Sequence, residues 1–400
     1  METFRSLTVL SIEQATALPF LTLRLAQEGM RVIRLENPPH GDPNRWVGQE
    51  VIPSPDNGPG HEPGMNAYFL PNNLGKESIT LSLGTAEGRD LLHRLVRELP
   101  VDIFATNQRP SSNKKLGVDY ASLRQLKPDL IWVGITGFGM GHEESAYDPI
   151  VQARAGFMEL TGDPHGDPMV FGLPMVDLGA GEHAYGQVMK SLYQRAVTGH
   201  GALIDISMFQ SAVSWMVSPV MLNLSFGQSV TRRGNVHPFF APVSVYPTAD
   251  GHIYLAVGND RQWEALVHLP DFEALEREAY RHNAGRIADV DELNQRMAAI
   301  TRLMSTEDLV SKCQHIGLPV SRVNSLSEVC ADPLIANQLV RARDSRSGME
   351  IAIAPPPLVP EYLRGSKMRM KFPPRLGEHN ELVFGALGSD IAGLRARGVL

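Results

Sequence analysis

Short apolar runs alternate with amphipathic stretches through the first half of the chain. Leucines at helical spacing occur over 17–28, where Gly29 ends the pattern, and over 85–99. Further helices are predicted over 177–195 and 207–220. Strands are predicted at the apolar runs 7–10, 31–35, 101–105, 130–134 and 202–206. This order of strands and helices predicts an α/β fold with a parallel sheet and helices on its faces.

The pattern changes after residue 225, where alternating runs replace the continuous ones. Two alternating runs, 243–246 and 252–257, flank the turn signal Thr248-Ala-Asp-Gly251 and predict a hairpin. The run 319–323 is expected to join that hairpin sheet. Polar helices are expected over 259–268, 288–304 and 305–316, the last with a weak capping box from Ser305 to Asp308.

We therefore divide the chain into a large α/β part at 1–220, a smaller α+β domain at 225–330, and a linker and return segment at 331–400. The return segment contains AIAPPPLVP and KFPPRLG, which are too rich in proline for regular structure. We expect it to wrap back over the first part.

Composition and charge restrict the class of protein. The chain has 400 residues, of which 43% are hydrophobic and 20% charged, as in soluble globular proteins of more than one domain. A net charge of −7 argues against a general nucleic-acid binder, which needs basic surface to neutralise phosphates. Cys313 and Cys330 form neither a disulfide framework nor a zinc spacing, so we predict a cytoplasmic protein with reduced thiols. No apolar run approaches the roughly 18 residues of a membrane span.

Common catalytic motifs are weak or missing. The stretch Gly137-Phe-Gly139-Met-Gly141 follows a strand but lacks the spacing of a dinucleotide-binding loop. No HExxH, Walker A or GxSxG pattern occurs, so neither a metal site nor a serine nucleophile has local support.

One carboxylate has an unusual setting. In FGLPMVDLGAG, Asp177 follows an apolar run and precedes Gly179 and Gly181, with no lysine or arginine within ten residues on either side. The residues alone leave two interpretations open. Asp177 caps the helix that follows it, or it is an unpaired carboxylate available for chemistry.

Polar and basic residues follow the ends of predicted strands. Lys76 ends the stretch NNLGK, and Asn107 and Arg109 follow the run 101–105, with Lys115 shortly after. The carboxyl ends of parallel strands form a crevice in which such side chains suit an anionic ligand. A solvated basic loop explains them equally well.

Nine blocks occur in a fixed order along the chain. They are VIRLENPPHGDPNR, NNLGKESITLSL, TNQRPSSNKKLGVDY, ITGFG, YDPIVQARAGFMELTG, LPMVDLGAG, TGHGALIDISMFQSAVSWM, GNVHPFFAPVSVYPTADGHIYLAVGND and PPRLGEH. Together they resemble the class III CoA-transferases, a family that includes formyl-CoA transferase, carnitine CoA-transferase and α-methylacyl-CoA racemase. The resemblance implies a Rossmann-like large domain formed by both chain ends, a small inserted domain and an interlocked dimer.

The resemblance implies a role for the aspartate of the block VDLGAG, which is Asp177 here. It would attack an acyl-CoA thioester to form a mixed anhydride, and CoA would then form an aspartyl-CoA thioester before passing to an acceptor acid. The flanking glycines would leave room for the acyl group.

Three residues of the block YDPIVQARAG bear on the reaction and the substrate. Racemases of the family have a histidine where Tyr147 precedes Asp148 here, and tyrosine is a poor base near neutral pH. This favours a transferase with Tyr147 and Asp148 in its substrate pocket. Arg154 replaces a small or apolar residue of relatives, so it is a candidate to hold the far carboxylate of a dicarboxylate such as succinate. It could equally be a surface or interface arginine.

The resemblance also implies a set of CoA contacts, with CoA as a substrate and no metal or other cofactor. The residues are Thr16, Asn72, Leu74, Lys76, Asn107, Arg109, Lys115 and Leu116. Asn37 and Lys115 stand where formyl-CoA transferase has arginines, and its glycine-rich flap is absent around Gly234. Three functions stay open: a CoA-transferase acting on carboxylic acids, a 2-methylacyl-CoA racemase, and a non-catalytic subunit. The expected assembly is a homodimer or a heteromer with a related chain.

Overall fold

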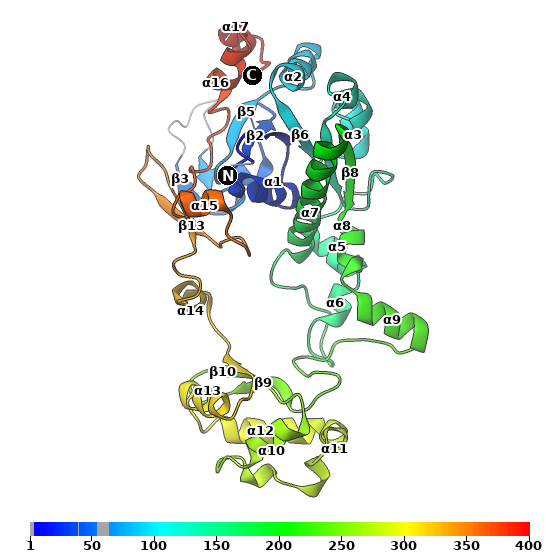
Figure 1. Cartoon of the computed structure of the whole chain (residues 1–400), viewed down its shortest axis with the longest axis vertical. Coiled ribbons are helices and arrows are strands. Elements are labelled where there is room, and N and C mark those ends of the chain that lie inside the picture. The colour runs from blue at the N-terminus through cyan, green and yellow to red at the C-terminus, as the bar shows by residue number, and fades with distance from the viewer. Residues whose placement is uncertain (1–3, 39, 54–63) are drawn as a thin grey trace. The chain divides into compact units, whose positions relative to one another are not determined.

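The computed structural model describes residues 4–38, 40–53 and 64–400, and the chain forms two compact units (Figure 1). Unit 1 comprises Met1–Ala155, Phe171–Met221 and Asn337–Leu400, so both chain ends belong to it. Unit 2 comprises Gly156–Val170 and Leu222–Ala336. The segment Gly156–Val170, which the sequence pattern left in the large part, therefore groups with unit 2.

Unit 1 is built on a six-stranded sheet in the order β5-β2-β1-β6-β7-β8, with every neighbouring pair parallel. The order runs outward from β1 and β6 in both directions, which places the topological switch point between these two strands. The strands are β1 (Thr8–Ile12), β2 (Arg31–Glu36), β5 (Glu77–Thr80), β6 (Val101–Thr106), β7 (Ile131–Thr136) and β8 (Ala202–Ser207). The predicted α/β class with a parallel sheet is confirmed.

Helices flank this sheet (Figure 1). Before its C-terminal segment, unit 1 has the helices α1 (Ala17–Gln27), α2 (Ala86–Glu98), α3 (Pro110–Leu116), α4 (Tyr120–Leu126), α5 (Asp148–Arg154), α7 (Met175–Thr198) and α8 (Met208–Ser214). The long helix α7 packs against α1, α5 and α8, and α5 also packs on α8. The single helix expected over 207–220 is instead two helices, α8 and α9 (Val217–Phe226).

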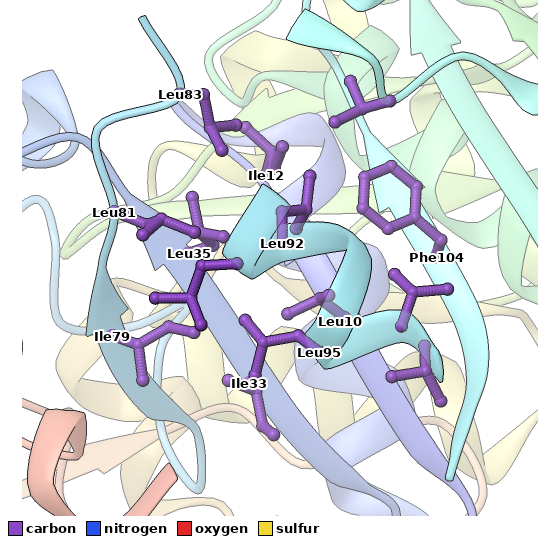
Figure 2. Packing of buried hydrophobic residues seen from close by; sticks show 14 of the residues in the cluster. Leu10, Ile12, Ile33, Leu35, Ile79, Leu81, Leu83, Leu92, Leu95 and Phe104 are labelled. Carbon is purple, nitrogen blue, oxygen red and sulfur yellow. The ribbon is translucent and has the colours of Figure 1, made fainter. Parts of the chain in front are cut away.

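The core between α2 and the sheet explains why the leucine pattern over 85–99 predicts a helix. Leu92 and Leu95 of α2 are fully buried, and Figure 2 shows them among Leu10, Ile33 and other apolar side chains of the strands. Each such side chain contributes about 1.5–3 kcal/mol when buried. The helix begins after Thr85, whose hydroxyl accepts the Gly88 N–H at 3.0 Å.

The C-terminal segment packs on the rest of unit 1. The Gly75 N–H donates to the Lys371 carbonyl at 2.9 Å, and Asn380 bonds both the backbone and the side chain of Thr80. Its elements are β12 (Val340–Arg343), β13 (Glu350–Ile353), α15 (Glu361–Gly365), α16 (Asn380–Ala386) and α17 (Ile391–Ala396). Several short elements of the first part were not predicted: β5, α3, α4, α5, η1 (Pro43–Trp46) and the β3 (Glu50–Ile52)–β4 (Met65–Asn66) pair.

Unit 2 contains the predicted hairpin and its third strand, in the order β11-β10-β9. The strands are β9 (Val243–Pro247), β10 (His252–Ala256) and β11 (Val320–Arg322), all antiparallel. The helices are α6 (Phe157–Leu160), α10 (Asp260–Val267), η2 (Glu273–Leu275), η3 (Glu278–Tyr280), α11 (Asn283–Ala288), α12 (Val290–Thr301), α13 (Thr306–His315) and α14 (Leu326–Ala331). Ser305 caps α13, but the complete capping box of this region joins Ser325 and Glu328 at α14. Over the described ranges of the chain, no helix is long and apolar enough to cross a membrane.

Candidate active site

Asp177 lies in the first turn of α7, which begins at Met175 with Pro174 as its N-cap. The capping interpretation of Asp177 is therefore wrong. The side chain that satisfies the helix start is Asp148, whose Oδ2 accepts the N–H of Val176 at 2.7 Å and of Asp177 at 3.0 Å. A carboxylate in this position suits the free N–H groups and partial positive charge of a helix N-terminus.

Asp148 is itself held firmly. It is the first residue of α5, only 5% of its surface is exposed, and Gln152 donates to its Oδ1 at 2.5 Å. A buried carboxylate needs hydrogen-bond donors to replace water, and Asp148 receives three. The structure thus brings Asp148 and Asp177 together, although 28 positions separate Asp148 from the first α7 residue that it contacts.

The Asp177 carboxylate is partly buried, and over 4–38, 40–53 and 64–400 no side chain pairs with it. Burial, and then the charge of Asp148, raise the pKa of Asp177 to about 7. Near neutral pH the carboxylate is thus partly ionised, and its ionised form is more basic than an ordinary aspartate. This combination suits a nucleophile, because a salt bridge would lower its reactivity.

Gly179 and Gly181 serve packing rather than access to the carboxylate. A Cβ atom at Gly179 would lie 2.0 Å from the ring of Trp215. At Gly181 it would lie 2.8 Å from the Phe20 ring and 3.1 Å from the Ala17 carbonyl oxygen. The expectation that these glycines leave room for an acyl group is replaced by a simpler reason: they let α1 and Trp215 approach α7 closely.

The other two residues predicted for the substrate pocket lie at opposite ends of α5. Tyr147 precedes the helix, and 74% of its surface is exposed. Arg154 ends the helix, about 9 Å along the axis from Asp148 at 1.5 Å per residue. Its Nη1 lies 2.7 Å from Glu144 Oε2, and its guanidinium covers the Phe138 ring at 4.2 Å. The structure does not place Arg154 beside Asp177.

A crevice of about 250 Å³ opens at the carboxyl edge of the sheet, next to the switch point. Ligands of open α/β sheets bind at this place. It is lined by the ends of β1 and β2, the segment after β5, and loop residues from β6 to α3. Lining residues include Glu13, Gln14, Glu36, Asn37, Gln108 and Leu116.

The residues predicted to contact CoA surround this edge unevenly. Leu116 lines the crevice, and Asn107 bonds the backbone of Gln14 through both ends of its amide, at 2.8 and 3.1 Å. Arg109 and Lys115 are exposed at the two ends of α3, and Arg109 reaches the Ser145 hydroxyl at 2.5 Å. The remaining side chains are less accessible: Thr16 and Leu74 are buried, and Asn72 is half-buried.

Lys76 is not free to hold a phosphate. The residue is 1% exposed, and its ammonium donates to Glu13 Oε1 at 2.7 Å, the Pro19 carbonyl at 3.0 Å and Asn73 Oδ1 at 3.1 Å. These three bonds use every donor that an ammonium has. Burial lowers the pKa of Lys76 to about 8, and Glu13 opposes that shift. The expected direct contact to CoA is therefore corrected to a structural role beneath the crevice.

Lys76 belongs to a buried charge cluster that sequence reasoning missed. The cluster contains three acids and three bases, Glu13, Glu36, Asp42, Arg34, Arg45 and Lys76, all nearly inaccessible to solvent. Arg34 Nη2 lies 2.8 Å from Asp42 Oδ2, and Arg45 Nη2 lies 2.7 Å from Glu36 Oε1. Burial disfavours the charge of Glu36, but Arg34 and Arg45 outweigh burial and hold its pKa below the usual range. The available signal was the charge of Arg34 inside the predicted apolar strand 31–35 and of Glu36 directly after it.

The sequence of this chain matches CoA-transferase family III over residues 5–380. The chain belongs to this family. It is 34% identical to a succinate–glutarate CoA-transferase of Agrobacterium fabrum, over 95% of this chain and 94% of the relative. It is 31% identical to a succinyl-CoA:mesaconate CoA-transferase of Haloarcula marismortui, over 86% of each. The crystal structure of a CAIB/BAIF family protein from Brucella suis matches with a TM-score of 0.80 and 31% identity, covering 95% of this chain and 98% of that one.

Membership of family III confirms the expected class of enzyme, a transferase for which coenzyme A is a substrate. In this CoA-transferase, the described residues contain no group of three or more His, Cys, Asp or Glu side chains arranged to hold a metal ion.

Proposed function

We propose that this CoA-transferase moves coenzyme A between two carboxylic acids, at least one of them a dicarboxylate, with Asp177 as the nucleophile. The observation that carries the proposal is a carboxylate at the start of α7 that pairs with no cation of the described residues and whose pKa is raised to about 7. The two relatives named above supply the substrate class, because their names specify succinate, glutarate and mesaconate.

The reaction proceeds by four acyl transfers. An oxygen of Asp177 attacks the thioester carbonyl of the donor, the C–S bond breaks, and CoA thiolate leaves a mixed anhydride. The thiolate attacks the Asp177 carbonyl, giving an aspartyl-CoA thioester and the free donor acid. An acceptor carboxylate attacks this thioester and releases the thiolate, which then attacks the acceptor carbonyl of the second anhydride. The new acyl-CoA leaves Asp177 as a carboxylate, and no proton is gained or lost.

Coenzyme A is proposed to bind at the crevice beside the switch point. Arg109 and Lys115 are the exposed cations nearest in sequence to the crevice residues Gln108 and Leu116, and they are proposed to contact the phosphates. The crevice acids Glu13 and Glu36 do not oppose this, because Lys76, Arg34 and Arg45 neutralise them from beneath.

The experiment that tests the function is a screen of CoA donors and acceptors. Succinyl-CoA is incubated with single mono- and dicarboxylic acids, and new thioesters are measured by mass spectrometry. Hydroxylamine added during turnover should convert Asp177 to its hydroxamate, whereas turnover without that adduct would eliminate the covalent mechanism. Deuterium entering C2 of a 2-methylacyl-CoA would instead establish racemase activity, and inactivity with every donor would favour a non-catalytic subunit.

Arg154 is proposed to hold the far carboxylate of the dicarboxylate. Its exposed ion pair with Glu144 is weak enough to be exchanged for a substrate carboxylate, and Phe138 supports its guanidinium. Arg154→Leu should raise the KM for dicarboxylates roughly tenfold and leave monocarboxylates unchanged. The matched control is Arg395→Leu, which removes a similarly exposed pair with Glu381 at 2.9 Å. An equal effect of Arg154→Leu on both substrate classes would show that Arg154 only supports the fold.

We also propose that the working enzyme contains two chains, interlocked as in the family that the sequence resembles. The support is α9, which has no charged residue and exposes Val217, Leu224 and Phe226 by 72%, 80% and 64%. Such an apolar helix surface is typical of an interface. Sedimentation of the purified chain should give the mass of a homodimer. A stable monomer that gains activity only with a related chain would establish the heteromer.

A further inference from the structure

A buried glutamine joins the two segments that shape the Asp177 site. Gln152 is fully buried on α5, four positions after Asp148, so the two side chains share one face of the helix. Its Nε2 donates to Asp148 Oδ1 at 2.5 Å and lies 3.5 Å from the Leu173 carbonyl oxygen. Its Oε1 accepts the Phe171 N–H at 2.9 Å. Only one orientation of the amide places its donor on the carboxylate and its acceptor on the N–H.

The connection continues through Asp148 to the nucleophile. One carboxylate oxygen of Asp148 faces Gln152, and the other accepts the backbone N–H groups of Val176 and Asp177. Gln152 therefore holds the segment before α7 with one end and the carboxylate that anchors α7 with the other. If the amide were lost, Asp148 Oδ1 would be buried without this donor and the carboxylate would be free to turn.

Other charged groups on the elements packed against α7 are occupied elsewhere. Arg24 of α1 pairs with Glu182 at 2.9 Å, and Glu28 accepts from Tyr185 at 2.7 Å. Further contacts of this kind are His183 with Ser211 of α8, Asp205 of β8 with the Met140 N–H, Arg154 with Glu144, and Arg195 of α7 with Asp102 of β6. Among the residues that the structure describes, Asp148 is the charged group that acts on Asp177.

We propose that Gln152 is a positioning residue for the reaction, which sets the orientation of the Asp148 carboxylate and through it the reactivity of Asp177. The inference rests on the proposed role of Asp177 as the nucleophile. Gln152 does not touch substrate; it acts through Asp148.

The informative variant is Gln152→Glu, which keeps the shape of the side chain. A protonated glutamic acid can donate to Asp148 and accept from Phe171 as the amide does. Once ionised, it places a second carboxylate against Asp148, and like charges at that distance repel. Relative to wild type, kcat should fall by less than about threefold near pH 5.5 and by at least about thirtyfold near pH 8, with the KM for the acyl-CoA unchanged. If Gln152 had a purely structural role, the loss of kcat in Gln152→Glu would not depend on pH.

A second readout does not require turnover. Esterification of Asp177 by a water-soluble diazo ester, followed by peptide mass spectrometry across pH, reports the protonated fraction of this side chain. The midpoint should move to higher pH in Gln152→Glu and stay in place in Gln187→Glu, which adds the same charge at an exposed position of α7. An unchanged midpoint together with a pH-independent loss of kcat would overturn the proposal.

Folding is controlled with Gln152→Met, an uncharged variant of similar length. It should lose kcat at least tenfold at all pH values while circular dichroism and the KM for the acyl-CoA stay unchanged. A loss of kcat that only follows the loss of folded protein would reduce Gln152 to a structural residue. If Asp177→Asn kept full activity while the labelling midpoint still moved in Gln152→Glu, the proposed function would fail and the coupling of Gln152 to Asp177 would stand.

Discussion

Replacing Asp177 by asparagine should stabilise the enzyme above neutral pH while removing activity. An ordinary aspartate has a pKa of 3.8, and in the folded protein burial and Asp148 raise the pKa of Asp177 to about 7. Between these values the folded state binds more protons than the unfolded state, so stability falls as pH rises and levels off above about 7. The carboxylate thus destabilises the fold wherever it is ionised.

The magnitude follows from the two pKa values. At 1.36 kcal/mol per pKa unit, the raised pKa of Asp177 lowers the free energy of unfolding by roughly 4 kcal/mol near pH 8. Near pH 5, where the unfolded state is ionised and the folded state is not, the reduction is about 2 kcal/mol. Asparagine has nearly the same shape and no charge, so the free energy of unfolding of Asp177→Asn should exceed that of wild type by most of this amount. For a unit of this size, 4 kcal/mol corresponds to a rise in Tm of roughly 8 °C.

The assay is thermal unfolding of wild type and Asp177→Asn at both pH values. The control is Asp90→Asn, at an exposed position of α2, which should shift Tm equally at both. A stabilisation by Asp177→Asn that is the same at pH 5 and pH 8, or a destabilisation at pH 8, would show that the carboxylate is not held at a raised pKa.

Three further outcomes are expected. The kcat/KM should rise roughly tenfold per pH unit up to about pH 7 and then level off, because the ionised Asp177 is the nucleophile; a profile that is flat between pH 5 and 7 would exclude this. Gly181→Val should lower the free energy of unfolding measured in urea by about 1–3 kcal/mol, because its Cβ meets Phe20. Gly186→Ala on the same helix has open space around it and should raise that free energy by up to about 1 kcal/mol. Arg45→Met should lower the free energy of unfolding by about 3–5 kcal/mol, because it removes a cation that pairs with the buried Glu36 carboxylate. Arg395→Met, at an exposed pair, should lower it by less than about 1 kcal/mol. Similar losses for both variants would mean that the buried cluster is not strongly coupled.

The longer helices and five of the six parallel strands could be predicted from local pattern, whereas the short helices α3, α4 and α5 were not predicted. The parallel strands β1, β2, β6 and β7 are buried on both faces and form continuous apolar runs in the sequence, and the leucines of α2 recur at helical spacing. The end of α1 could also be predicted, because Gly29 follows it with a positive φ of 94°, a conformation that few other residues adopt. The exception is β5, a four-residue edge strand with the sequence ESIT, which is a strand because it pairs with β2.

The residues of the site could be predicted from the sequence only in part. Asp177 could be singled out because no lysine or arginine lies within ten residues of it in the sequence, and the nine blocks in their order indicated the family. Whether Lys76 faces a ligand or the interior could not be read from NNLGK. That depends on Glu13 and Pro19, more than fifty positions away in the chain.

The sequence by itself determined the α/β class, the family and the identity of the unpaired aspartate, because these depend on periodicity and on motifs within short windows. Only the tertiary structure decided how that aspartate is tuned. Its helix starts earlier than the pattern indicates, because Asp148 on α5 satisfies the N–H groups of Val176 and Asp177. Hydrogen bonds and charges act over a few ångströms in space, and no local pattern specifies which distant segments will come that close.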